Sequence, residues 1–217
     1  MNLVFPPLYA IIDPTLLKTS ELAFAERMAE SGVELLQYRN KYATSRQLFE
    51  VSKMLSNALL RMSTANGSAV RLIVNDRADV ALLSGSGGVH VGQRDLPAED
   101  ARAIVGARAW VGVSTHSLEQ VDAADKTSAD YIAFGPVFAT ATKQNPDPVV
   151  GLELLAQARL RTRKPLVAIG GVTLERAADT YRAGADSLAV IRDLLAAADP
   201  AAQARAFLKE AQRVRAS

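Results

Sequence analysis

The chain has 217 residues, of which 49% are hydrophobic and 22% charged, a composition that excludes a disordered or fibrous protein and fits one soluble domain. Its 25 basic and 23 acidic residues leave a formal charge of +2, which gives no reason to expect nucleic-acid binding. The absence of cysteine excludes disulfides, thiolate metal sites and a cysteine nucleophile.

Short apolar, β-rich segments recur along the chain, and an amphipathic helical pattern follows each of them. The predicted strands are 8–13, 35–40, 71–76, 88–91, 110–115, 131–137, 165–171 and 187–192. The predicted helices are 20–32, 44–64, 77–85, 97–106, 117–125, 150–161, 173–183 and 199–215.

Continuous apolar runs, rather than alternating ones, indicate strands that are buried on both faces of a parallel sheet. Eight strand–helix units predict an α/β fold, a (β/α)8 TIM barrel that forms one catalytic domain over residues 1–217. An open, doubly wound sheet is the alternative. No Gly-x-Gly-x-x-Gly motif follows the first strand, however, where a dinucleotide-binding fold needs it.

The second predicted strand ends in Gln37-Tyr38-Arg39-Asn40-Lys41, in which residues 37, 39 and 41 share one face. In a TIM barrel, polar residues at the carboxyl ends of the strands point into the active site. Arg39 and Lys41, converging with a metal ion, would form a cradle for pyrophosphate. A solvated basic loop is the alternative for this segment taken alone.

Aspartates follow the third and fourth predicted strands, Asp76 directly after Asn75 and Asp95 19 positions later. Neighbouring parallel strands place both carboxylates at the same edge of the sheet, which predicts a divalent-cation site and a phosphate-bearing ligand. Each aspartate alone is better explained as a helix cap, and His90 alone as a packed core residue. The coincidence of such endings on successive strands favours a site.

The fifth predicted strand leads into Ser114-Thr115-His116-Ser117, where Ser117 can act as the N-cap of the next helix. The sixth is followed by Thr140-Ala141-Thr142-Lys143 and a polar Gln-Asn-Pro-Asp-Pro segment. Residues 138–149 have the size and composition of an active-site lid. Lys143 would clamp phosphate when this lid closes, and a solvated loop lysine is the alternative.

Glycines follow the seventh predicted strand at Gly170-Gly171, and Ile191-Arg192-Asp193 ends the eighth. The loops after strands seven and eight are the usual phosphate-binding position in TIM barrels, so we predict a phosphate site here. A tight turn that requires positive φ is the alternative explanation of the glycines.

Taken in order, these motifs resemble the thiamine phosphate synthase family, and the resemblance spans nearly the whole chain. The segments that carry it are Gln37-x-Arg39-x-Lys41, Asn75-Asp76, His90-x-Gly92-Gln93-x-Asp95, Gly112-x-Ser114-Thr115-His116-Ser117, Gly135-Pro136-x-Phe138-x-Thr140-x-Thr142-Lys143 and Ala168-Ile169-Gly170-Gly171. The resemblance implies a transferase that joins 4-amino-5-hydroxymethyl-2-methylpyrimidine diphosphate to 4-methyl-5-(2-phosphoethyl)thiazole, or to its carboxylated form. Thiamine phosphate would form and pyrophosphate would leave.

The resemblance also implies a role for each matching residue. Asp76 and Asp95 would bind Mg2+, the implied cofactor. Catalysis would depend on Arg39, Lys41, Ser114 and Lys143. The substrates would contact Tyr9, Gln37, Arg39, Lys41, Asn75, His90, Ser114, Thr140, Thr142, Lys143, Gly171, Ile191 and Arg192. Pyrophosphate would leave in a dissociative step through a carbocation, which requires no protein nucleophile.

Asn40 and Arg192 depart from the family, which commonly has an acidic residue and a serine at these positions, so the role of the Arg192 side chain stays open. A thiazole tautomerase of the same fold would place a histidine where this chain has Pro136, and proline is neither an acid nor a base. A noncatalytic phosphate-sensing barrel would be expected to lose the metal ligands or Lys143.

Residues 1–7 lack the basic and apolar segments of a signal peptide, and no window approaches about 18 uncharged apolar residues. We therefore expect a cytoplasmic protein that binds small-molecule substrates and neither membranes nor nucleic acids. The sequence leaves the oligomeric state open, and a homo-oligomer is compatible with it.

Overall fold

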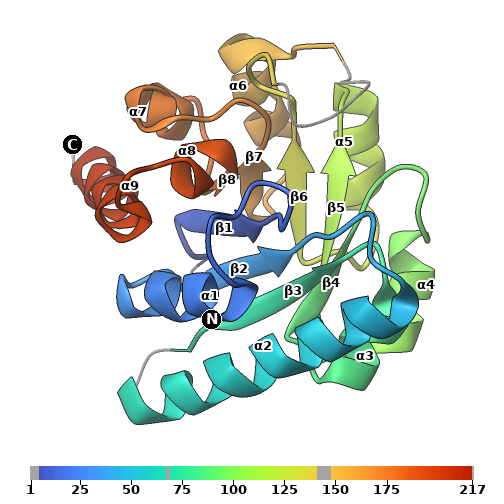
Figure 1. Ribbon diagram of the computed structural model, residues 1–217. Helices are drawn as coiled ribbons and strands as arrows, with labels where there is room; N and C mark the ends of the chain where they lie inside the picture. Colours follow the sequence, from blue (N-terminus) through green and yellow to red (C-terminus); the bar gives the residue numbers. More distant parts are fainter. Residues whose placement is uncertain (1–4, 67–68, 141–147, 217) are drawn as a thin grey trace.

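Eight parallel strands close into a barrel in the computed structural model, which describes residues 5–66, 69–140 and 148–216 (Figure 1). The strands are β1 (Leu8–Ile12), β2 (Leu35–Tyr38), β3 (Arg71–Asn75), β4 (Gly88–Val91), β5 (Trp110–Thr115), β6 (Tyr131–Phe134), β7 (Leu166–Ala168) and β8 (Ser187–Val190). Their order around the barrel is their order in the chain, and β8 pairs with β1 to close it. The predicted TIM barrel is confirmed, and the open-sheet alternative is wrong.

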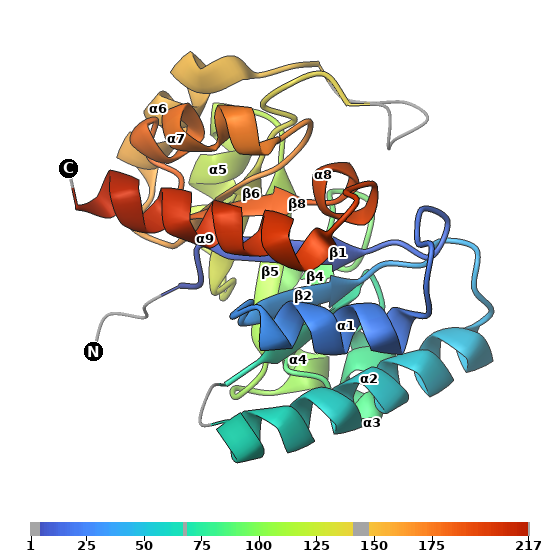
Figure 2. The ribbon, with the colours of Figure 1, turned by 60° about the vertical axis from the view of Figure 1, so that its left-hand side comes forward.

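Helices surround the barrel and connect the strands. They are α1 (Glu21–Glu30), α2 (Ser45–Asn66), α3 (Ala78–Ser84), α4 (Ala98–Val105), α5 (Leu118–Asp125), α6 (Gly151–Arg161), α7 (Leu174–Arg182), α8 (Arg192–Leu195) and α9 (Pro200–Arg215). Ser20, Ser117 and Asp199 cap α1, α5 and α9, each accepting a bond from a backbone N–H in the first turn. Helix α9 packs against α7 and α1, which completes the outer ring (Figures 1 and 2).

The structure departs from the predicted elements at the rim of the barrel. Several predicted strands, such as 131–137 and 165–171, run past the true ends at Phe134 and Ala168, because their last residues leave the sheet to line its rim. The predicted strand 187–192 also overlaps α8, a helix that the prediction missed. Helix α8 has four residues, too few for a helical period to be visible in the sequence. Hydrogen bonds to neighbouring helices stabilise it. Asp193 accepts from the backbone N–H of Leu174 and from the Gln203 amide.

Side chains that alternate along each strand divide the core into two parts. One set, including Leu36, Val74 and Leu188, faces the helices in the larger apolar cluster. The other set, including Tyr9 and Tyr131, fills the interior of the barrel. Both sets are apolar, which explains the continuous hydrophobic runs of the sequence. The interior cluster consists of Phe5, Tyr9, Ile11, Leu35, Ile73, Tyr131, Ala133, Val167 and Ala189.

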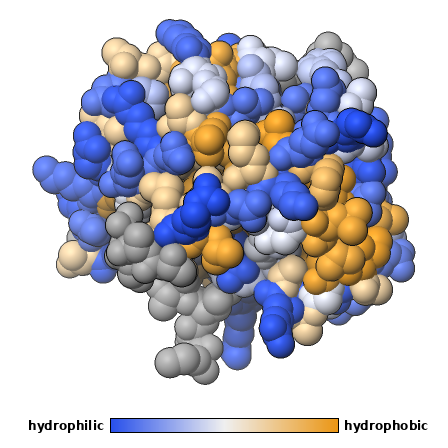
Figure 3. Space-filling view, turned by 60° about the horizontal axis from the view of Figure 1, so that its bottom comes forward, coloured by the Kyte–Doolittle hydropathy of each residue, from blue (hydrophilic) through white to orange (hydrophobic). Residues whose placement is uncertain are grey.

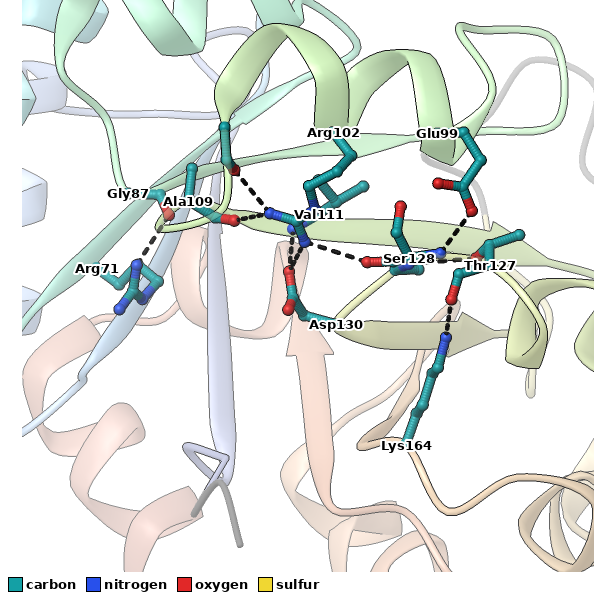
Figure 4. A network of polar contacts seen from close by, with 12 residues as sticks. Arg71, Gly87, Glu99, Arg102, Ala109, Val111, Thr127, Ser128, Asp130 and Lys164 are labelled. Carbon is teal, nitrogen blue, oxygen red and sulfur yellow. Dashed lines mark hydrogen bonds and ion pairs between the residues drawn. The ribbon is translucent and has the colours of Figure 1, made fainter. Parts of the chain in front are cut away.

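A polar network fastens α4 to the amino ends of β5 and β6 (Figure 4). The Arg102 guanidinium donates to the backbone carbonyls of Gly106, Ala109 and Ser128 and forms an ion pair with Asp130. The same Asp130 carboxylate accepts from the backbone N–H of Val111 at 2.7 Å. One arginine therefore donates to three backbone carbonyl groups that lie outside the helices and strands at this end of the barrel.

The same arrangement recurs two strands later. Arg159 of α6 pairs with Asp186 at 2.6 Å, and Asp186 accepts from the N–H of Leu166 at 2.8 Å. Arg159 also donates to the backbone carbonyls of Thr162 and Lys164. Each unit joins a helix, a strand start and the loop before the next strand. Both lie at the amino ends of the strands, where TIM barrels build stability rather than catalysis.

The outer surface on the α2, α3 and α4 side carries exposed apolar side chains. They are Met54, Leu60, Leu82, Leu83 and Ile104. Figure 3 shows one concentrated apolar area on the part of the molecule that is at the bottom of Figure 1. Within the described part of the chain, no helix combines the length and apolar character needed to cross a membrane.

We predict that Arg102→Met lowers the free energy of unfolding by about 1–3 kcal/mol, because it leaves Asp130 and three carbonyl groups without their partner. Arg182→Met is the matched control. It removes an exposed ion pair with Asp179 on one helix and should change stability by no more than about 0.5 kcal/mol. Urea unfolding measures both variants, and equal losses would contradict the structural role of Arg102.

Candidate active site

A cavity of about 1360 Å³ opens where the strands end at their carboxyl side. All the predicted site residues that the structure describes line it. They are Tyr9, Gln37, Arg39, Lys41, Asn75, Asp76, His90, Asp95, Ser114, Thr140, Gly171, Ile191 and Arg192. Thr142, Lys143 and most of the predicted lid lie outside the described residues. Counting the strands therefore identified residues that are far apart in the sequence and lie around one cavity in the structure.

The two aspartates that follow β3 and β4 face each other at one wall of this cavity. Asp76 has φ 64°, which makes it the one non-glycine residue with positive φ in the described ranges. Its N–H donates to the His90 carbonyl at 2.8 Å, which ties it to β4. Asp95 accepts from the N–H of Gly92 at 2.7 Å. Backbone strain of this kind concentrates at functional sites.

Neither aspartate caps a helix. The N-cap positions of α3 and α4 are Arg77 and Pro97, and neither side chain makes a capping bond. The helix-cap alternative is therefore wrong for Asp76 and for Asp95. Their carboxylates are left to act at the cavity.

The acidic pair concentrates negative charge. Burial raises the pKa of Asp76, and the neighbouring charge of Asp95 raises it further, while Lys41 acts in the opposite direction. The Lys41 ammonium lies 3.3 Å from the Asp76 carboxylate. Two hard oxygen donors whose charges repel fit a cation such as Mg2+, which proteins bind through one or two carboxylates and substrate phosphate oxygens. Within the described ranges, no group of three or more His, Cys, Asp or Glu side chains forms a candidate metal site.

Arg39 is held by a carboxylate that the sequence analysis did not single out. Its guanidinium donates to Asp13 at 2.7 Å, and Asp13 is only 4% exposed. The other oxygen of Asp13 accepts from the Thr15 hydroxyl and N–H. Asp13 directly follows β1, which pairs with β2, so its position at the carboxyl end of a strand was the signal that could have identified it as a site residue. The bond to Asp13 holds one nitrogen of the guanidinium, and Arg39 also lines the cavity, where its other N–H groups can donate.

A chain of buried polar groups lies at the base of the cavity. The Gln37 amide donates to the Tyr9 hydroxyl at 2.7 Å, and the hydroxyls of Tyr9 and Tyr131 are 2.9 Å apart. The two ring nitrogens of His90 are 3.1 Å from the Tyr131 hydroxyl and 2.8 Å from that of Ser114. Burial raises the pKa of both tyrosines and lowers that of His90 to about 4, so all three side chains are neutral near pH 7.

Tyr131 reaches His90 across a glycine. His90, Gly112 and Tyr131 pair side by side on β4, β5 and β6. A Cβ atom at Gly112 would lie 2.0 Å from Cζ of the Tyr131 ring, so a larger residue would displace the tyrosine. The sequence analysis quoted Gly112 and missed Tyr131, because a tyrosine at the start of an apolar strand resembles any core residue.

The opposite wall of the cavity is built by the loops after β7 and β8. Gly170 and Gly171 have φ 86° and 65°, and a Cβ at Gly171 would lie 2.4 Å from the Ala139 carbonyl. Both glycines are thus required by the turn, as the alternative explanation held, and they also line the cavity. Arg176, also missed from the sequence, donates to the Gly171 carbonyl at 2.7 Å. It brings a further cation to this wall.

His116 and Gln120 also line the cavity, and sequence reasoning gave neither a role. The Gln120 side chain accepts from the N–H of His116 at 2.7 Å, and the His116 ring contacts the Gly135 carbonyl. The only sequence signal for their place at the site was their position, a histidine directly after β5 and a glutamine in the first turn of α5. These bonds connect the loops that follow β5 and β6.

The fold and the cavity define a class, the (β/α)8 barrels with a cavity at the carboxyl ends of their strands, where barrel enzymes hold their active sites. The chain belongs to the thiamine monophosphate synthase family, whose model matches residues 8–194. Membership makes it a transferase of thiamine biosynthesis, as the sequence resemblance predicted.

Individual relatives agree with this assignment. The chain is 48% identical over 215 residues to a thiamine-phosphate synthase of Koribacter versatilis, covering 96% of this chain and 97% of that one. It is 41% identical to the enzyme of that name from Chloroflexus aurantiacus, covering 91% and 89%. A solved thiamine phosphate pyrophosphorylase from Pyrococcus furiosus superimposes with a TM-score of 0.84 at 32% identity, covering 96% of both chains.

We predict that His90 makes the protein less stable in acid. Its pKa falls from 6.5 in the unfolded chain to about 4 in the folded one, so the unfolded chain takes up the proton first as pH falls. The contribution is fully present above pH 6.5 and is lost towards about pH 4, by at most about 3 kcal/mol. Urea unfolding at several pH values should therefore show a steeper acid loss for the wild type than for His90→Gln. Carboxylates titrate in both proteins and cancel in the comparison, so equal slopes would contradict the prediction.

Proposed function

We propose that the protein joins 4-amino-5-hydroxymethyl-2-methylpyrimidine diphosphate to 4-methyl-5-(2-phosphoethyl)thiazole, or to its carboxylated form, and releases pyrophosphate. The observation that carries this proposal is the grouping of Arg39, Lys41, Asp76 and Asp95 on one wall of the cavity. Such a wall can hold a diphosphate and a divalent cation together. The names of the relatives point to the same reaction.

The diphosphate would bind at the acidic wall. Asp76 and Asp95 would hold Mg2+, which when bound supplies positive charge to the departing pyrophosphate. Lys41 and Arg39 would donate to the phosphate oxygens, and Asn75 would add an amide donor. The Asp13 partner supports this role of Arg39, because a guanidinium fixed on one side presents its remaining N–H groups in a defined direction.

The pyrimidine would lie over the buried polar chain, in contact with Tyr9, Gln37 and His90. Its carbon–oxygen bond to the diphosphate breaks, and the electron pair leaves with the pyrophosphate oxygen. The electron-rich aminopyrimidine stabilises the resulting carbocation, and the thiazole nitrogen attacks it to form the new carbon–nitrogen bond. The chain has no cysteine, and this route requires no protein nucleophile. Its residues act by stabilising charge, with Ser114 directed at the leaving group.

The thiazole phosphate would bind at the opposite wall, at Gly171 and the backbone of Ile191 and Arg192. Two observations support this placement. Gly170 and Gly171 line the cavity and carry no side chains there, so their backbone N–H groups are not screened from an anion. Arg192 and Arg176 line the same part of the cavity and add positive charge. The roles of Thr140, Thr142, Lys143 and the lid remain predictions.

Two alternatives share the fold. A thiazole tautomerase would use a histidine where Pro136 lines the cavity, and proline offers no acid or base. A phosphate sensor would be expected to lose the metal ligands, and Asp76 and Asp95 are both present at the cavity. Cytoplasmic location and the lack of nucleic-acid partners stay predictions from the sequence, and the oligomeric state stays open.

We predict that the purified protein with both substrates and Mg2+ forms thiamine phosphate, and that Asp76→Ala lowers its turnover by at least about 100-fold through loss of charge stabilisation. Asp79→Asn is the matched control, because Asp79 is exposed and pairs with Arg77 outside the cavity. A coupled pyrophosphate assay measures all three proteins. Undiminished turnover in Asp76→Ala would remove the proposed role of the acidic pair.

Pyrophosphate binding should require Mg2+, because the Asp76 and Asp95 carboxylates repel the anion unless a cation lies between them. Isothermal calorimetry with pyrophosphate, in Mg2+ and in EDTA, tests this directly. We expect binding in Mg2+ and a loss of affinity of at least about 10-fold in EDTA. Equal affinity in both would instead favour the tautomerase or the sensor.

A further inference from the structure

The buried polar chain has a direction, and the direction can be derived from its donors. The Gln37 amide nitrogen donates to the Tyr9 oxygen, so the hydrogen of the Tyr9 hydroxyl is available for the Tyr131 oxygen 2.9 Å away. Tyr131 then donates to Nδ1 of His90, at 3.1 Å. A neutral imidazole that accepts at Nδ1 carries its hydrogen on Nε2, which donates to Ser114 Oγ at 2.8 Å.

The opposite direction conflicts with the Gln37 amide. If Tyr131 donated to Tyr9, the Tyr9 oxygen would receive two hydrogens and its own hydrogen would need a further acceptor. The described residues show the Tyr9 hydroxyl bonded only to Gln37 and Tyr131. Since Tyr9 is 1% exposed, that unpaired hydrogen would be costly. The direction from Gln37 to Ser114 gives the hydroxyl hydrogens of Tyr9 and Tyr131 and the ring hydrogen of His90 one acceptor each.

This direction determines what Ser114 offers to the cavity. Its oxygen receives the His90 hydrogen, and no second partner of that hydroxyl appears among the described residues. Ser114 lines the cavity, so its own hydrogen is left to donate there. A preorganised hydroxyl donor is the kind of group that stabilises developing negative charge.

Tyr131 occupies the decisive place in the chain without lining the cavity. It is fully buried, and its ring stacks on His90 with centroids 5.5 Å apart. Phe5 packs against it, and Gly112 provides the space that it crosses. These contacts hold the Tyr131 hydroxyl at Nδ1 of His90.

We propose that Tyr131 is a positioning residue, which holds His90 in the Nε2–H tautomer and thereby turns the Ser114 hydroxyl hydrogen toward the leaving pyrophosphate. The first part concerns the protein alone. The second part rests on the proposed function of the site.

The tautomer can be measured without substrate. The chain has two histidines, so long-range 1H–15N correlation spectra can be assigned with a His116→Gln variant. We expect His90 to carry its hydrogen on Nε2 in the wild type at neutral pH, and to lose that preference in Tyr131→Phe. Tyr181→Phe is the matched control, because it removes a tyrosine hydroxyl that bonds to the Pro7 carbonyl and lies outside the cavity. A wild-type His90 with its hydrogen on Nδ1 would overturn the proposal.

Kinetics test whether Tyr131 acts through Ser114. We expect Tyr131→Phe to lower kcat about 10-fold with little change in KM, and Ser114→Ala to lower it about 100-fold. The double variant should be no slower than Ser114→Ala, because Tyr131 can no longer orient a Ser114 hydroxyl that is absent. If the two losses multiply, Tyr131 is merely structural and the proposal fails. A wild type without synthase activity would refute the proposed function and leave the tautomer result intact.

Discussion

The hydroxyl groups of Tyr9 and Tyr131 meet inside the barrel, and the layering of the interior depends on that contact. Below it the Tyr131 ring packs on Phe5, which stacks on Trp110. Above it lies the polar wall of the cavity. Two buried hydroxyls need partners, and in a narrow barrel they find them in each other and in the residues of the next layer, Gln37 and His90. The boundary between apolar floor and polar site is thus set by two phenol groups.

Two cations of the site are each held by a carboxylate. Arg39 is paired with Asp13, and Lys41 with Asp76. A planar guanidinium and a compact ammonium have different geometries, so exchanging them would alter the direction of the donors while keeping the net charge. The direction of these donors would matter for the proposed substrate, whose reacting bond lies next to a diphosphate.

The sequence predicted the barrel and the location of the site because eight apolar runs and the polar residues after them are local signals. Asp76 and Asp95, for example, were separable from helix caps only by their places on successive strands. What it missed depends on distant contacts. Asp13 acquires its role from an arginine on the next strand, and Tyr131 from a histidine two strands away. Helix α8 is likewise held by bonds to α7 and α9 rather than by its own pattern.

The arginine–aspartate units at the amino ends of the strands have a consequence for how such a molecule can change over time. Arg102 with Asp130 and Arg159 with Asp186 repeat the same connection at an interval of two strands. Each unit is complete within one stretch of chain and shares no residue with the cavity at the other end. Mutations in the loops that line the cavity therefore leave both arginine–aspartate units unchanged. In such a barrel, the loops at the carboxyl ends of the strands can change in sequence and acquire new substrates, while the contacts at the amino ends keep the fold stable.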